Sequence, residues 1–148
     1  MLNRSKATFF SACVLSVLFL LVQSSFTQQR MSDRDIENIM KNLKNDSKRF
    51  ESSFNSAISK STIRNTSQEK TDKELVKSFQ DQTENMLNIF QDKRTANTTL
   101  PGVLGLVPQI DALFVDVHLG GSAKSDWKKC KAELAILAEQ FNMPMPKP

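Results

Sequence analysis

A cysteine and a histidine are the side chains best suited to nucleophilic chemistry here. The sequence has two cysteines, Cys13 and Cys130, and one histidine, His118. Cys13 lies in the N-terminal segment and leaves with it, so Cys130 is the cysteine that stays. A hydrolase built on this pair would need an exposed thiol beside the imidazole. Cys130 falls instead on an apolar helical stripe, which predicts a buried small hydrophobe; an intermolecular disulfide and a reactive thiol are the alternatives. His118 lies near the end of a predicted helix, where we expect a capping cation or a surface residue.

Metal and cofactor sites need ligand sets that this sequence does not contain. Covalent haem attachment requires Cys-x-x-Cys-His, and a di-iron bundle requires Glu-x-x-His pairs, but neither motif occurs. One cysteine and one histidine do not make a zinc site. We therefore expect no cofactor and no metal.

Pairs of acidic residues could imitate a catalytic carboxylate dyad. Glu69 with Asp72 and Asp81 with Glu84 have suitable spacing on a helix. Solvated helix faces produce such pairs routinely, so we interpret them as surface charge rather than as general acids and bases. Trp127 is likewise expected to anchor the core instead of forming a ligand platform.

The distribution of charge argues against a nucleic-acid partner. The 148 residues carry 20 Lys and Arg against 16 Asp and Glu, and the mature net charge falls from +4 to +2 when Arg4 and Lys6 leave with the signal. Acids and bases alternate through every segment, whereas a nucleic-acid binder concentrates its positive charge. Glycosylation sequons begin at Asn45, inside a predicted helix, and at Asn65 and Asn97, where we take them only as evidence of exposed loops.

Residues 1–27 have the three regions of a secretory signal peptide. Arg4 and Lys6 precede an apolar run over residues 7–22, and small residues follow. The run is shorter than the roughly 20 residues that cross a bilayer, so an uncleaved anchor is the weaker alternative. Cleavage after Ser24 or Thr27 fits best. We expect a secreted or periplasmic protein that meets the membrane only through this segment, before cleavage.

Apolar residues at steps of three and four predict four helices after the signal. They span about 33–60, 72–94, 101–119 and 123–141. Ser32 is an expected N-cap of the first helix, and Thr71 and Glu74 form a capping box for the second. Pro101 suits the first turn of the third helix, whereas Gly105 and Pro108 should weaken or kink it. The proline-rich tail at 143–148 cannot continue the fourth.

Each apolar stripe must be buried against another, which predicts an all-α, up-and-down four-helix bundle over residues 28–142. The expected core anchors are large aromatic residues on these stripes: Phe50, Phe54, Phe79, Trp127 and Phe141.

The third helix is apolar on two sides. Leu104, Val115 and Leu119 project opposite to its main stripe, so we interpret them as an interaction surface for a partner or a second copy. The alternative is that Gly105 and Pro108 break the helix and the second stripe never forms.

The C-terminal third resembles a group of small exported proteins from soil bacteria of the acidobacterial type. The matching residues are Val103-Leu104, Ile110-Asp111, Asp126-Trp127, Leu134, Leu137-Ala138 and Phe141-Asn142. The resemblance implies a signal peptide, a helical bundle and no particular activity. The chain departs from the group over residues 115–119, where the group is expected to have arginines.

These features favour an exported, non-enzymatic protein that acts by partner binding or by self-association. The alternative is an enzyme or a small-ligand carrier with a pocket between its helices. An interaction protein should expose a continuous apolar stripe, whereas a carrier should enclose a large cavity.

Overall fold

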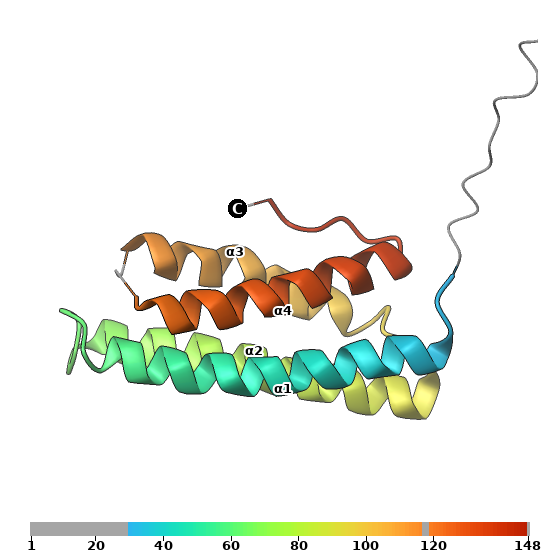
Figure 1. Ribbon diagram of the computed structural model, residues 1–148, viewed down its shortest axis with the longest axis horizontal. Helices are drawn as coiled ribbons and strands as arrows, with labels where there is room; N and C mark the ends of the chain where they lie inside the picture. Colours follow the sequence, from blue (N-terminus) through green and yellow to red (C-terminus); the bar gives the residue numbers. More distant parts are fainter. Residues whose placement is uncertain (1–29, 117–118, 148) are drawn as a thin grey trace, which may run out of the picture.

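The computed structural model describes residues 30–116 and 119–147, which form four α-helices joined by short connections (Figure 1). Each helix reverses the direction of the one before it. Helix α1 packs beside α2 and α4, and α3 packs beside the same two helices, so that α1 and α3 lie diagonally opposite. The expected all-α four-helix bundle is confirmed. The predicted signal peptide over 1–27 lies outside the described residues.

Helix α1 spans Asp33–Ile58 and begins as its sequence predicts. The Ser32 hydroxyl accepts a 3.2 Å hydrogen bond from the backbone N–H of Asp35, and the acids of the first turn face the positive end of the helix dipole. The buried side follows the expected steps of four and three: Ile36, Met40, Leu43, Ser47, Phe50, Phe54 and Ile58.

Helix α2 spans Ser67–Lys93, so the predicted start at 72 is wrong. The chain contains two successive Thr-x-x-Glu boxes, at residues 66–69 and 71–74, and the helix uses the upstream one. Thr66 Oγ1 accepts from the N–H of Glu69 at 3.2 Å, while the Glu69 carboxylate accepts from the N–H of Asn65. The first contact satisfies a free N–H donor of the first turn, and the second fixes the backbone just before the N-cap.

Helix α3 spans Leu100–Asp116 and continues through Gly105 and Pro108, so the alternative in which these residues break the helix is wrong. Leu104 is only 5% exposed, so its assignment to an interaction surface is also wrong. The reason is that α3 contacts α2 on one side and α4 on the other, which buries apolar residues on two sides of one helix. The predicted end at 119 is not reached, and residues 117–118 lie outside the described part.

Helix α4 spans Gly121–Gln140 and starts two residues earlier than expected, with Gly120 as an extended N-cap. The segment 143–147 is not helical, as its prolines predict. Met143 and Met145 from this segment are partly buried against the core. No helix in the described part of the chain combines the length and the apolar character needed to span a membrane.

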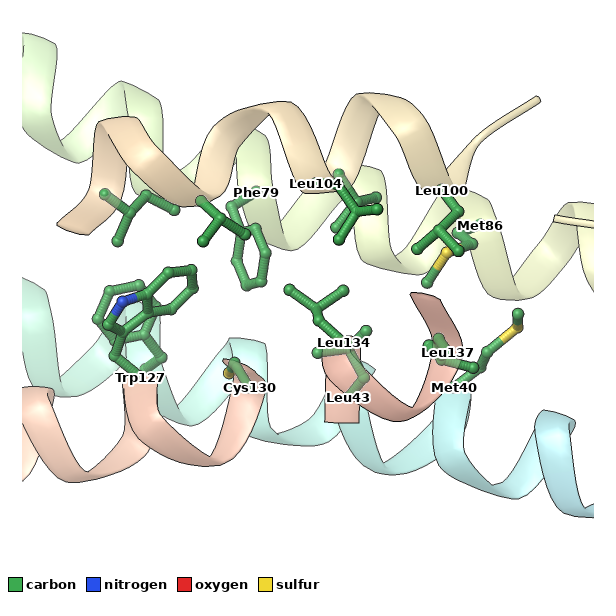
Figure 2. Packing of buried hydrophobic residues seen from close by; sticks show 14 of the residues in the cluster. Met40, Leu43, Phe79, Met86, Leu100, Leu104, Trp127, Cys130, Leu134 and Leu137 are labelled. Atoms are coloured by element: carbon green, nitrogen blue, oxygen red, sulfur yellow. The ribbon is translucent and has the colours of Figure 1, made fainter. Parts of the chain in front are cut away.

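Aromatic residues fill one half of the core. Phe50, Phe54, Phe79 and Trp127 are each at most 2% exposed, and the Trp127 ring centroid lies 5.2 Å from those of both Phe50 and Phe79. Aliphatic and sulfur-containing side chains continue the core toward the other end of the bundle. Figure 2 shows side chains from all four helices pointing into this space, among them Met40, Leu43, Met86, Leu100, Leu104, Cys130, Leu134 and Leu137.

Candidate functional site

A polar cleft of about 370 Å³ lies at the end of the bundle where α2 and α4 finish. Its volume falls within the range of small-molecule sites, roughly 300–1,000 Å³. It combines the segment before α1, the α2–α3 connection and the end of α4. Its lining consists of Arg30, Arg94, Thr95, Asn97, Glu139, Gln140, Phe141 and Asn142. We refer to it as the end cleft.

The α2–α3 connection is fixed by backbone geometry. Arg94 caps α2 in the left-handed region, at a φ of 52°, and its N–H donates to the Phe90 carbonyl at 2.8 Å. The next turn is closed by the Thr95 hydroxyl, which accepts from the N–H of Asn97 at 3.3 Å. A non-glycine residue in the left-handed region is uncommon and needs such support.

The end of α4 forms a Schellman motif. Asn142 takes the left-handed conformation, at a φ of 53°, and its N–H donates to the Glu139 carbonyl at 3.1 Å. The N–H of Met143 reaches back to the Ala138 carbonyl at 2.8 Å. These two bonds define a Schellman cap, in which asparagine sometimes replaces the usual glycine. The cap presents Phe141 and Asn142 at the cleft.

Two contacts tie the cleft to the N-terminal part of the chain. Gln140 Oε1 accepts from the backbone N–H of Met31 at 2.9 Å, which holds the residue next to Arg30 against the end of α4. Arg94 Nη1 donates to Glu37 Oε2 at 2.9 Å, across from α2 to α1. Lys41, Gln91 and Arg94, in decreasing order of effect, lower the pKa of Glu37 to about 2. Glu37 is therefore a carboxylate at neutral pH and holds the Arg94 guanidinium.

The residues proposed from sequence as an interaction surface do not reach the end cleft. Val115 is 78% exposed near the opposite end of the bundle, and Leu119 is partly buried against the core. Val115 and Ile136 are the exposed large hydrophobics of the described residues, so they do not form a continuous apolar stripe. Phe141 is half-buried at the cleft, where its ring meets Phe90 edge-on at 6.4 Å.

Among the acids proposed as dyad look-alikes, Glu69, Asp81 and Glu84 pair with lysines, and Glu69 and Asp72 are buried rather than on the solvated face that was expected. Glu69 Oε1 lies 2.5 Å from Lys73 Nζ, and Asp81 Oδ2 lies 2.8 Å from Lys77 Nζ. Glu84 Oε1 lies 2.6 Å from Lys44 Nζ, and that ammonium is the main cause of its lowered pKa. The lysine partners lower the pKa values of Glu69 and Glu84, which keeps these two carboxylates ionised at neutral pH rather than sharing a proton.

Cys130 is fully buried, as the sequence predicts. Burial is the main cause that raises the pKa of its thiol, and the carboxylates of Glu133 and Asp46 add to it. A protonated, buried thiol is a poor nucleophile. Its proposed partner His118 lies outside the described residues. Within residues 30–116 and 119–147, no group of three or more Cys, His, Asp or Glu could hold a metal ion.

The α1–α4 interface holds a further buried carboxyl group. Glu133 Oε2 is buried without a hydrogen-bond partner among the described residues. The pKa of Glu133 is raised to about 7, mainly by burial and also by Asp46 on α1, while Lys129 acts in the opposite direction. This carboxyl group is a feature of helix packing, remote from the end cleft.

Asn97 lies in an exposed turn, as the sequence predicts, whereas Phe141, expected as a core anchor, caps α4 and is only partly buried against the core. Sequence reasoning did not identify Arg94, Asn142 or Arg30 as neighbours. Comparison of the chain with protein-family models, curated proteins and solved structures gave no match.

Proposed function

We propose that this protein is an exported, non-enzymatic helical protein that binds a polar partner molecule through the end cleft. The observation that carries the proposal is the construction of the cleft. Three chain segments meet there, and two of them are held by Arg94 and Asn142, two of the three left-handed non-glycine residues among the described residues; the third, Asn65, does not line the cleft. Such conformations cost free energy and cluster at functional sites.

The chemistry of the cleft favours binding over catalysis. Its lining offers guanidinium, amide, hydroxyl and carboxylate groups, which recognise polar ligands through hydrogen bonds. Two candidate groups outside the cleft are unsuited to catalysis, because Cys130 is buried and Glu69 is ion-paired with Lys73. The proposal therefore assigns recognition to the cleft and a scaffolding role to the helices.

Export is supported by the signal-peptide pattern over residues 1–27 and by the resemblance of the C-terminal third to small exported bacterial proteins. A secreted or periplasmic protein encounters envelope components. A polar, partly basic cleft is better able to bind polar envelope components than an apolar ligand.

The test is photocrosslinking in the exporting host, with a benzophenone amino acid placed at Asn97 in the end cleft. Matched positions are Asn45, exposed in the middle of α1, and Val115, exposed at the end of α3. The proposal predicts a discrete adduct at Asn97 and none at the other two. An adduct at Val115 without one at Asn97 would move the interaction surface to α3. The absence of adducts at all three positions would contradict partner binding at the cleft.

A further inference from the structure

We infer that the end cleft takes a carboxylated sugar, such as a uronic-acid residue of a saccharide. The inference rests on the proposed function of the cleft and adds the chemical class of its ligand. It follows from the charges, the amide groups and the aromatic ring that the cleft brings together.

Two guanidinium groups select for an anion. Arg30 and Arg94 both line the cleft, and guanidinium groups bind planar carboxylates in a bidentate manner. Arg94 Nη1 pairs with Glu37 Oε2 at 2.9 Å, which orients the guanidinium group. The other N–H donors of the guanidinium group can bind a ligand. Because its position is already fixed, less side-chain entropy is lost on binding.

The remaining charge limits how negative the ligand can be. Glu139 also lines the cleft, and its carboxylate would repel a doubly charged phosphate more strongly than a singly charged carboxylate. When Glu37, the partner of Arg94, is counted as well, two arginines and two glutamates give a formal charge of about zero, so one added carboxylate is tolerated better than a doubly charged group. A sugar acid therefore fits better than a sugar phosphate.

Amide side chains supply the contacts that hydroxyl groups need. Asn97 and Asn142 are exposed at the cleft, and each carries donors and an acceptor. Gln140 uses its oxygen for Met31 and so keeps its amino group for a ligand. A sugar ring presents hydroxyl groups that both donate and accept, so mixed amide groups suit it.

Phe141 provides an apolar surface within this polar lining. Its half-buried ring is supported edge-on by Phe90, with the centroids 6.4 Å apart. The face of a sugar ring carries C–H groups that pack on an aromatic ring. A small free carboxylate such as propionate would not use this surface.

Isothermal titration calorimetry with digalacturonate tests the inference on the purified exported protein. We expect a Kd of about 1 mM or tighter. The neutral galactose disaccharide and propionate should each bind at least tenfold more weakly, because the first lacks the carboxylate and the second lacks the sugar ring. Arg94→Gln and Arg30→Gln should each weaken digalacturonate binding at least tenfold. Arg49→Gln is the matched control and should change nothing, because Arg49 pairs with Asp46 on α1 and does not line the cleft.

Arg94→Gln also removes the contact with Glu37, so circular dichroism must show that the variant is folded. Arg30→Gln is the second variant, because Arg30 lies outside the helices and the core. Digalacturonate binding that is equal in wild type and both variants would overturn the inference. Absence of binding, together with a photoadduct at Asn97, would overturn the ligand class and leave the cleft as a partner site. Absence of both would overturn the proposed function as well.

Discussion

The indole N–H of Trp127 donates a 2.7 Å hydrogen bond to Asp111 Oδ1, which joins α4 to α3. The same oxygen accepts from Lys131 Nζ at 2.7 Å. Helices α3 and α4 are the least closely packed of the four neighbouring pairs, so this shared carboxylate is a main polar tie between them. Trp127 thus fills the aromatic core and satisfies its polar atom at the edge of that core.

Asp111→Ala should lower the free energy of unfolding by about 1–3 kcal/mol, because it leaves a partly buried indole N–H and an ammonium group without their acceptor. Urea denaturation measures the change. Trp127→Phe removes the N–H but keeps most of the ring, and in the Asp111→Ala background it should cost less than in wild type. Equal costs in the two backgrounds would show that the hydrogen bond contributes nothing.

The bundle could be predicted from sequence because helix formation and burial depend on local periodicity. Phe50 and Trp127 were placed in the core from their spacing alone, and both are buried. The start of α2 could not be fixed, since Thr66 and Thr71 open equivalent capping boxes and only the folded chain selects one.

The burial of Leu104 depends on the number of helices that pack against α3. The apolar pattern of one helix does not reveal that number. The end cleft could not be predicted from the sequence for a related reason. Arg94 and Asn142 end different helices and meet only through the tertiary fold, and neither residue belongs to a motif of ligand-binding residues.

A buried pair of hydroxyl groups links α1 and α2. Ser47 Oγ lies 2.9 Å from Thr83 Oγ1, and each oxygen is also within hydrogen-bond distance of a backbone carbonyl, that of Lys44 or Gln80; because each hydroxyl has one proton, one hydroxyl donates to the other, which in turn donates to its carbonyl. Ser47→Ala or Thr83→Val should each cost about 1 kcal/mol, because one hydroxyl loses its partner in the core.

The double variant Ser47→Ala with Thr83→Val should cost less than the sum of the two single changes, since no buried hydroxyl is then left without a partner. Chemical denaturation of all four proteins gives the coupling energy. Strict additivity would show that the two hydroxyl groups do not interact.

Stability should fall as the pH rises through neutrality because of Glu133. Its pKa is raised from 4.5 to about 7 in the folded protein, so the stabilising effect is complete below pH 4.5 and is lost as the pH passes 7. Because the side chain is only partly buried, we expect a loss of about 1–2 kcal/mol. Denaturation between pH 5.5 and 8.5 avoids Glu37, Glu69 and Glu84, whose lowered pKa values place their effects at acidic pH.

Glu133→Gln should flatten this pH profile, because the amide does not titrate. Glu74→Gln is a matched control on an exposed part of α2 and should leave the slope unchanged. A slope that persists in Glu133→Gln would assign the titration to another group.

Removal of metal ions should leave the protein unchanged. Treatment with a chelator is expected to shift neither the melting temperature nor the circular-dichroism spectrum, because the sequence lacks a set of soft or imidazole ligands. Elemental analysis of protein from the native host checks the same point. A stoichiometric transition metal would contradict it.

The most direct test of the end cleft as the binding site is a map of backbone amide NMR shifts during titration of the purified protein with digalacturonate. The account predicts that the shifts concentrate at residues 94–97 and 139–142, where the two left-handed residues hold the cleft. Saturation of these shifts should give the affinity measured by calorimetry. Shifts that concentrate around Val115 at the end of α3, or a spectrum that does not change, would contradict it.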